Sequence, residues 1–374
     1  MAPQENYFFY FIITPGLEDL AREELLEKWK QLQIVHPDIF KNAPDIRSSI
    51  GGLSISTNYA AGASLNHYLK IPTRILLRLD TFRSRDLPKL YERLRKIPWE
   101  NYFRDDSVFV KASSHGSRLK IKERIVNTAL SAIRNRQEHQ SFRKKFLDVP
   151  QTVLIRIVDD DVTVSLDLSG EFLYLRGYKP HNPEAPLRET LAAALYFSAC
   201  LNFKKQFHQI YDPFCGSGTL LFEAQQFWKP NTHRPFAFSN FPITAKLLTP
   251  QKWTSLGSEI DIKAWGSEKN SKEFLALEKN IEIYSKKTKM SVDVHHEDAL
   301  SANVQLDGET LVITNPPYGQ RIEDSALFRE YIKKNSPKAW AVIAPQEVLR
   351  SLSCRKTHET TNGGLGVHIA ISKD

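Results

Sequence analysis

Short apolar segments alternate with amphipathic segments along most of the chain. The apolar run at residues 7–13 predicts a buried strand, and apolar positions recurring every three to four residues from 17 to 29 predict a helix after it. The same patterns predict strands at 51–57, 74–80 and 107–112, helices at 60–68 and 120–136, and a hairpin of 153–158 with 162–168. The first 170 residues or so are therefore expected to form a compact α+β unit.

A different order of elements follows a proline-rich connection. Three prolines lie between positions 178 and 186, which favours a domain boundary near residue 175. After it we expect a helix at 187–203, a strand ending at Asp212, a glycine turn, and alternating strands and helices to about residue 348. That order predicts an α/β, Rossmann-like domain with a doubly wound, mainly parallel sheet. Residues 228–261 interrupt the alternation with prolines and aromatics, so we treat them as an insertion.

Charge is distributed unevenly over the 374 residues. The whole chain has 51 Lys and Arg against 43 Asp and Glu, a formal charge of +8, whereas residues 70–145 alone carry an excess of about +12. The basic residues of that region form four clusters, at 83–85, 93–96, 118–122 and 143–145. A single cluster is typical of a solvated surface, but four of them on an otherwise slightly acidic chain favour a nucleic-acid partner.

Composition excludes several other classes of protein. A hydrophobic content of 41% is enough for folded cores, and the longest apolar run of about seven residues is too short to span a membrane. No secretory leader is evident at the amino end. The three cysteines form no Cys-x-x-Cys pair, and His295 and His296 have no third ligand spaced with them, so neither a disulfide framework nor a metal site is expected. These features predict a soluble protein of the reducing cytoplasm.

The sequence from Asp212 to Thr219 predicts a ligand site. It places a carboxylate at the end of a strand, then two glycines that allow the backbone to approach a ligand, then the start of a helix. The third glycine of a dinucleotide fingerprint is replaced by Leu221, and no Gly-Lys-Ser/Thr follows to hold a triphosphate. We therefore expect a nucleotide-like ligand without a pyrophosphate.

Two later carboxylates fit the same site. Glu268 ends a second predicted strand before a helix, so it could accept hydrogen bonds from two ribose hydroxyls. Glu259 lies in a similar sequence and is its rival, but no helix pattern follows it. Asp298 ends a third predicted strand, and its carboxylate could accept from an exocyclic adenine amine.

The sequence Asn315-Pro316-Pro317-Tyr318 follows another apolar strand. Two consecutive prolines fix the backbone and lack N–H donors, so the Asn315 side-chain oxygen and the Pro316 carbonyl can both accept from one planar NH2 group. Tyr318 could stack on the ring that bears this amine. Simple turns after strands are the alternative for this segment and for the glycine turn.

These motifs together resemble the S-adenosylmethionine-dependent amino-group methyltransferases. Residues 175–181 and 185–195 are also similar to the THUMP-domain RNA guanine-N2 methyltransferases, the bacterial 23S rRNA enzymes and their archaeal tRNA relatives, and residues 89–119 resemble part of a THUMP domain. The resemblance implies three parts: a ferredoxin-like segment (1–65), a THUMP domain (66–170) and a methyltransferase domain (171–374). It implies that the cofactor is held by Pro186, Arg188, Asp212, Pro213, Phe214, Gly216, Gly218, Thr219, Glu268, Asp298, Ala299 and Asn315, and the base by the catalytic residues Asn315, Pro316, Pro317 and Tyr318.

Two positions depart from the family's pattern. Gln320 stands where an acidic residue is expected, and Glu268 stands where Asp is commoner. Some bacterial relatives also carry a second methyltransferase domain downstream. The resemblance implies methyl transfer to guanine N2 of structured RNA, bound through residues 70–145, with 23S rRNA expected ahead of tRNA. The rival hypotheses are a DNA adenine-N6 methyltransferase, a protein glutamine methyltransferase, and an RNA-binding protein without activity.

Overall fold

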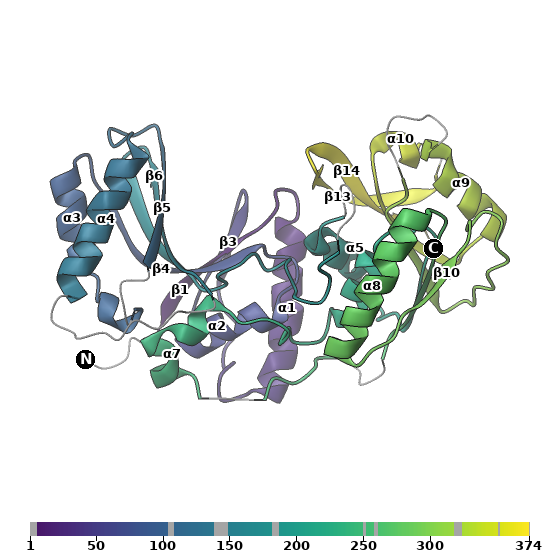
Figure 1. The fold of residues 1–374 in the computed structure, drawn as a ribbon, viewed down its shortest axis with the longest axis horizontal. Helices are drawn as coiled ribbons and strands as arrows, with labels where there is room; N and C mark the ends of the chain where they lie inside the picture. The colour runs from purple at the N-terminus through teal and green to yellow at the C-terminus, as the bar shows by residue number, and fades with distance from the viewer. Residues whose placement is uncertain are drawn as a thin grey trace.

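The protein folds into an α+β unit followed by an α/β unit, each built on a seven-stranded sheet (Figure 1). The computed structural model describes residues 6–103, 108–137, 149–181, 187–249, 252–257, 261–317, 324–350 and 352–373. None of the helices within these ranges is long and apolar enough to cross a membrane.

The first sheet contains all strands of the amino-terminal unit in the order β2-β3-β1-β4-β7-β6-β5. Neighbouring strands are antiparallel except for the parallel pair β5 and β6. Because β4 pairs with both β1 and β7, the sheet runs without a break from the first predicted part into the THUMP-like part. Its strands are β1 (Tyr7–Ile12), β2 (Ile46–Ser49), β3 (Gly52–Thr57), β4 (Arg74–Arg83), β5 (Val108–His115), β6 (Gln151–Val158) and β7 (Asp161–Asp167).

Helices cover one face of this sheet. They are α1 (Glu18–Val35), α2 (Tyr59–Tyr68), α3 (Leu87–Arg95) and α4 (Lys122–Gln137), with a 3-10 turn, η1 (Trp99–Asn101). Along β1, Phe9 and Phe11 are fully buried beneath the helices, whereas Phe8 is 58% exposed on the opposite face. The prediction of a buried strand at 7–13 is therefore wrong for one face, because no helix of the described residues packs there.

The second sheet confirms the doubly wound, mainly parallel topology. Its order is β10-β9-β8-β11-β12-β14-β13, and the five strands from β10 to β12 are parallel. A carboxy-terminal antiparallel hairpin, which the sequence patterns did not predict, adds β14 and β13 at one edge. The strands are β8 (Gln209–Asp212), β9 (Lys263–Glu268), β10 (Asp293–His296), β11 (Thr310–Thr314), β12 (Ala339–Ala344), β13 (Cys354–Asn362) and β14 (Leu365–Ser372).

One helix, α5, precedes the first strand of this sheet, and helices follow most of its parallel strands. They are α5 (Glu189–Phe203), α6 (Thr219–Gln226), α8 (Ser271–Thr288), α9 (Asp324–Asn335) and the short α10 (Gln346–Leu349). Helix α6 begins directly after the glycine turn, and the side chain of Asn270 caps α8 by accepting from the backbone N–H groups of Lys272 and Glu273. The ends of β8 and β9 are thereby fixed next to helix starts.

A cluster of buried charges joins the two units. The Glu223 carboxylate on α6 accepts from the guanidinium of Arg176 at 3.0 Å and from the hydroxyl of Tyr178. Arg176 also donates to the backbone oxygen of Lys70 at 2.7 Å, and Lys28 of α1 lies 3.8 Å from the centre of the Phe227 ring. Residues distant in the sequence are therefore held together by polar contacts closed to solvent.

The insertion at 228–261 packs against the amino-terminal unit. It contains a 3-10 turn, η2 (Ala237–Asn240), and α7 (Pro242–Leu247). The hydroxyls of Tyr59 and Thr244 are 2.7 Å apart, and the rings of His67 and Trp253 are 4.6 Å apart. Its many aromatics therefore fill an interface between the two units.

The carboxy-terminal hairpin also contacts the amino-terminal unit. The Thr360 hydroxyl of β13 donates to the Pro15 carbonyl at 2.9 Å. A Cβ placed on Gly16 would lie 1.8 Å from the Glu359 carbonyl oxygen, and Gly16 has φ +89°, so only glycine fits there. The hairpin and the loop after β1 are in direct backbone contact.

Candidate active site

Asp212 lies at the carboxyl end of β8, between β9 and β11. Its carboxylate accepts from the Thr314 hydroxyl at 2.7 Å and from the Phe214 N–H at 3.0 Å. The pKa of Asp212 is raised to about 7, mainly by burial and to a smaller extent by the nearby carboxylate of Glu268, while the two hydrogen bonds oppose the shift. Asp212 is thus a buried carboxyl group that titrates near neutral pH.

The glycine turn follows Asp212 and wraps around one end of a cavity. Gly216 and Gly218 have φ values of +51° and +85°, which favour glycine. A Cβ on Gly218 would lie 2.7 Å from the side chain of Leu277, whereas a Cβ on Gly216 would meet nothing within 4 Å. The backbone at Gly216 therefore faces open space, where a ligand can approach it.

Glu268 is held beside this turn. One carboxylate oxygen accepts from the Gly216 N–H at 2.9 Å, and the other accepts from the Asn270 N–H at 2.7 Å. Each carboxylate oxygen can accept a further hydrogen bond, so Glu268 remains able to bind a ligand hydroxyl. Its rival Glu259 lies outside the described residues.

Asp298 lies just beyond the end of β10, on a neighbouring wall of the cavity. Its Oδ1 accepts from the Leu300 N–H at 2.9 Å, and its Oδ2 is 3.7 Å from the ammonium group of Lys269. The adjacent Glu297 accepts from the Ser267 hydroxyl at 2.7 Å. Two acidic side chains after β10 are therefore fixed by contacts to their neighbours.

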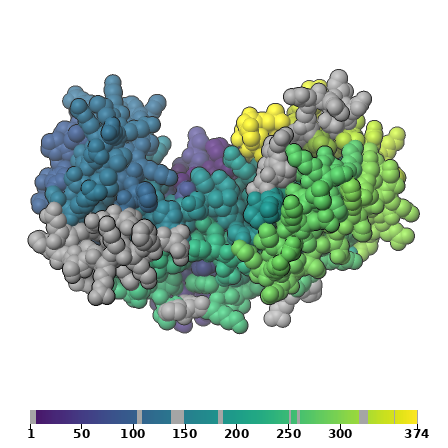
Figure 2. Space-filling view, in the orientation of Figure 1, coloured from purple at the N-terminus to yellow at the C-terminus, as the bar shows by residue number. Residues whose placement is uncertain are grey.

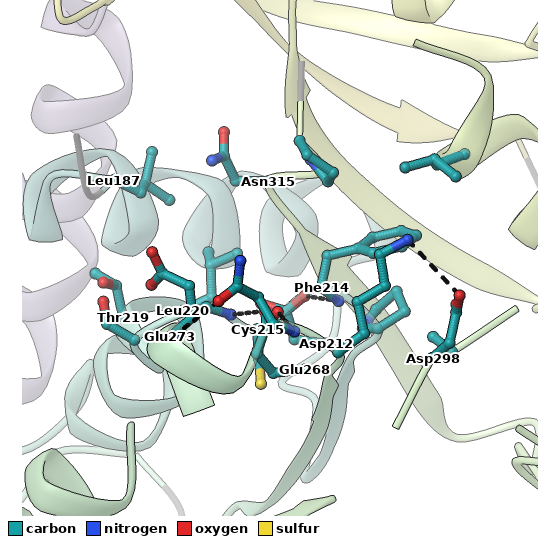
Figure 3. Close-up of a pocket in the computed structure, with 18 of the residues that line it drawn as sticks. Leu187, Asp212, Phe214, Cys215, Thr219, Leu220, Glu268, Glu273, Asp298 and Asn315 are labelled. Carbon is teal, nitrogen blue, oxygen red and sulfur yellow. Dashed lines mark hydrogen bonds and ion pairs between the residues drawn. The ribbon is translucent and has the colours of Figure 1, made fainter. Parts of the chain in front are cut away.

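The segment after β11 forms the opposite wall. Asn315 and Pro317 line the cavity, Pro316 is buried behind them, and Tyr318 lies outside the described residues. In Figure 3, Asn315 and Leu187 lie above Asp212, Glu268 and Thr219, with Asp298 to one side. The ends of four parallel strands thus meet around one space, as expected for ligand sites of open parallel sheets.

The cavity has a volume of about 370 Å³, which lies in the range of small-molecule sites. Its predicted lining residues are Asp212, Pro213, Phe214, Gly216, Thr219, Glu268, Asp298, Ala299, Asn315 and Pro317. Arg188, Gly218 and Pro316 are not among the lining residues, and Pro186 lies outside the described residues. The other lining residues are Leu187, Cys215, Ser217, Leu220, Lys269, Asn270, Glu273, Glu297 and Leu327.

The walls of the cavity are strongly acidic. Among the described lining residues there are five carboxyl groups against one ammonium group, that of Lys269, so this part of the site favours a ligand with positive charge. Asn270 and Glu273 could have been expected from the sequence, because both lie in the turn after Glu268 that starts α8. Among the described residues, no group of three His, Cys, Asp or Glu is arranged to hold a metal ion.

Comparisons with known proteins agree with this geometry. Residues 176–353 match the family model of the RMKL-like methyltransferase domain, and residues 84–167 match that of the THUMP domain. A ribosomal RNA large subunit methyltransferase K/L from Marinomonas sp. is 28% identical over 290 residues, which cover 70% of this chain and 39% of that protein. The Acinetobacter baylyi protein of the same name is 25% identical over all of this chain and 54% of its own length. The chain thus spans about half the length or less of these curated relatives.

Solved structures share the fold over nearly the whole chain. A predicted N6-adenine-specific DNA methylase from Listeria monocytogenes has a TM-score of 0.73 at 20% identity, covering 97% of this chain and 96% of that one. SMU.472, solved in complex with SAH, has a TM-score of 0.75 at 19% identity, covering 99% and 98%. The fold and the site therefore define a class I methyltransferase domain preceded by an α+β unit. The two family matches lie one after the other, so the chain joins a THUMP domain to an RMKL-like methyltransferase domain.

Proposed function

We propose that this protein is an S-adenosyl-L-methionine-dependent RNA methyltransferase. It transfers a methyl group to the exocyclic N2 amine of a guanosine in structured RNA, with 23S rRNA as the substrate. The observation that carries this proposal is the single acidic cavity that brings the glycine turn, Glu268, Asp298 and Asn315 together. The names of the curated relatives support the choice of ribosomal RNA. The proposed RNA substrate and the sparse cysteines support a cytoplasmic location for the reaction.

The cavity fits the proposed cofactor. The open space at Gly216 admits a ligand against the backbone, and the acidic walls complement its positive charge. When bound, S-adenosylmethionine supplies an electrophilic methyl group on a sulfonium. We assign Glu268 to the ribose hydroxyls and Asp298 to the adenine amine, as hydrogen-bond acceptors. The other cofactor contacts proposed are Asp212, Pro213, Phe214, Gly216, Gly218, Thr219 and Ala299, together with Pro186 and Arg188, which precede α5 in the sequence.

The segment after β11 orients the accepting amine. The Asn315 side-chain oxygen and the Pro316 carbonyl accept the two hydrogens of the guanine NH2, which directs the nitrogen lone pair toward the methyl group. Pro317 fixes the backbone, and Tyr318 stacks on the base. Because the base must leave its stack to reach this pocket, unpaired guanosines are favoured over guanosines in a duplex.

A direct transfer needs no covalent nucleophile from the protein. The thiol of Cys215 lines the cavity, but burial raises its pKa well above the ordinary value and nearby Asp212 adds to this effect. The thiol therefore stays protonated, and its role is packing.

The pH dependence of cofactor binding should report on Asp212. With a pKa of about 7, this carboxyl group is mostly neutral at pH 6 and mostly ionised at pH 8. Since ionised Asp212 attracts a cation, we expect the affinity for S-adenosylmethionine to fall by up to about tenfold from pH 8 to pH 6. Asp212→Asn should bind more weakly at pH 8 and lose this dependence, as measured by calorimetry. Equal affinities of the unmodified protein at both pH values would contradict the role.

The same titration affects stability in the opposite sense. The folded-state pKa of about 7 lies above the ordinary value of 3.8, so the folded state binds more protons between these two pH values. The contribution of Asp212 to the free energy of unfolding should therefore decrease as the pH rises through this window, and stay constant above it.

The substrate is tested by offering labelled S-adenosylmethionine together with undermethylated 23S rRNA, tRNA, duplex DNA or protein. N2-methylguanosine in rRNA supports the proposal in full, and the same nucleoside in tRNA changes only the substrate. N6-methyladenine in DNA, or a methylated glutamine, would overturn the choice of base while leaving the cofactor site intact.

RNA binding through the basic region should depend on salt. Two of its predicted basic clusters are partly neutralised by ion pairs, because Arg85 pairs with Asp160 and Arg93 pairs with Asp80. The cluster at 143–145 lies outside the described residues. With about six phosphates contacted, raising the salt from 50 to 200 mM should weaken RNA binding by about 1,000-fold. Filter binding over this range measures the slope, and a flat response would remove the basic region from the mechanism.

A further inference from the structure

The face of the first sheet opposite its helices is open. In Figure 1, α3 and α4 lie to the left of β5 and β6, and α2 lies beneath β1 and β3. On the other face there is a groove of about 780 Å³ that lies over β1, β3, β4 and β6. Figure 2 shows the indentation between the two lobes of the molecule, near this part of the chain. This surface, the open sheet face, lies mainly on strands that precede both matched family models.

Strand register brings aromatic and basic side chains together on the open sheet face. Phe8 of β1 is paired with Ser56 of β3 and with Arg78 of β4. Tyr10 follows two residues later on the same face, and the guanidinium of Arg78 lies 4.2 Å from the centre of its ring. Because alternate residues of a strand are about 7 Å apart, the exposed ring of Phe8 lies next to the ring of Tyr10 that carries the Arg78 guanidinium.

The charges on the open sheet face favour an anionic partner. Arg78 and Arg156 are close enough for their charges to interact, and burial together with this neighbour lowers the pKa of Arg78. The Nε of Arg78 is buried without a hydrogen-bond partner among the described residues. The carboxylates at the rim are already engaged, Asp45 by Arg47 at 3.5 Å and Asp80 by Arg93 at 2.9 Å.

We infer that the open sheet face binds a single-stranded segment of the substrate RNA. Phe8 stacks on an unpaired base, while Arg78, which lies over the Tyr10 ring, and Arg156 contact phosphates. An exposed aromatic ring suits a base that has left its stack, and it offers nothing to a base inside a duplex. Ser54 and Ser56 of the neighbouring β3 have small polar side chains, so they leave space for a base beside the ring of Phe8. This inference rests on the proposed function, because it assigns the RNA of that reaction a second contact away from the active site.

The test measures binding of a fluorescent single-stranded RNA of about ten nucleotides, and of a hairpin of the same composition, by anisotropy. Phe8→Ala should weaken binding of the single strand by about tenfold. Arg156→Gln should weaken it several-fold and reduce the salt slope by about one. The matched controls are Ile34→Ala, at a side chain that is 80% exposed on α1, and Lys30→Gln on the same helix. Both controls should stay within about twofold of the unmodified protein, since a lone exposed side chain away from the interface adds little.

Phe8 and Arg156 are both exposed, so their replacement leaves the packed core intact, and equal melting temperatures of all variants check this directly. If Phe8→Ala and Ile34→Ala bind the single strand equally well, the inference is overturned. It is also overturned if the unmodified protein binds the hairpin duplex more strongly than the single strand. Methyl transfer to RNA with an unchanged KM in Phe8→Ala would also overturn it while leaving the proposed function standing. If the unmodified protein binds single-stranded RNA through Phe8 but methylates no RNA, the proposed function fails instead.

Discussion

Replacing Asn315 with alanine is expected to lower the rate of methyl transfer by about 100- to 1,000-fold. The side-chain oxygen of Asn315 is the proposed acceptor for one hydrogen of the guanine amine, at the end of β11 and across the cavity from Glu268. Without it the amine loses its orientation toward the methyl group. The affinity for the cofactor should change little, because Glu268 and Asp298 remain in place. Single-turnover transfer and calorimetry with S-adenosylhomocysteine measure the two quantities separately.

The control for this variant is Asn303→Ala, which removes the same side chain at an exposed position of the same domain. Its rate should equal that of the unmodified protein. Asn315→Asp keeps an acceptor oxygen and should retain more activity than Asn315→Ala. If Asn315→Ala instead fails to bind the cofactor, the residue belongs to the cofactor site and its assigned role is wrong.

Replacing Glu223 with glutamine is expected to lower the free energy of unfolding by about 3 to 5 kcal/mol. Glu223 is fully buried and is the carboxylate that faces the guanidinium of Arg176, which is itself buried. Removing the negative charge leaves a positive charge without compensation in a region closed to solvent. Because the same guanidinium also holds the backbone of Lys70, contact between the two units should weaken. Urea denaturation measures the change.

Glu282→Gln is the matched control for that loss. Glu282 forms an i,i+4 ion pair with Lys286 on the surface of α8. Loss of this exposed pair should leave the free energy of unfolding unchanged within error. The double variant Glu223→Gln with Arg176→Met should recover part of the lost stability, since it removes the unpaired charge and keeps similar volume. A loss below about 1 kcal/mol for Glu223→Gln would show that Arg176 finds another partner.

The main site motifs could be located from the sequence because each one follows an apolar run. Asp212 and Glu268 are the last residues of β8 and β9, Asn315 directly follows β11, and parallel strands bring their carboxyl ends to one edge. Glu297 could not be placed in this way. Its approach to Ser267 depends on the pairing of His296 with Glu268, and strand register is not evident in a hydrophobic pattern.

Elements with few buried residues were also missed. Helix α3 buries only Leu90 and Leu94, which is too few apolar positions to indicate a helix. Its arginines were therefore interpreted only as part of a basic cluster. Strand β13 lies at the edge of its sheet, and nearly all of its side chains are exposed or only partly buried. Its sequence therefore lacks the regular hydrophobic alternation that indicates a strand. Phe8 was expected to be buried because an aromatic residue inside an apolar run looks the same whether or not a helix covers it. An unbroken apolar run such as β1 does not show whether one face of the strand or both faces are covered.

The contact of Thr360 and Glu359 with the loop after β1 has a consequence for synthesis on the ribosome. The amino-terminal sheet can form once residue 167 has emerged, but the surface around Pro15 and Gly16 stays uncovered until β13 is made. Domains generally fold in order as the chain emerges. The loop after β1 therefore stays exposed until nearly all of the second unit has been synthesised. A nascent chain that stops before β13 should be cleaved by proteases in that loop.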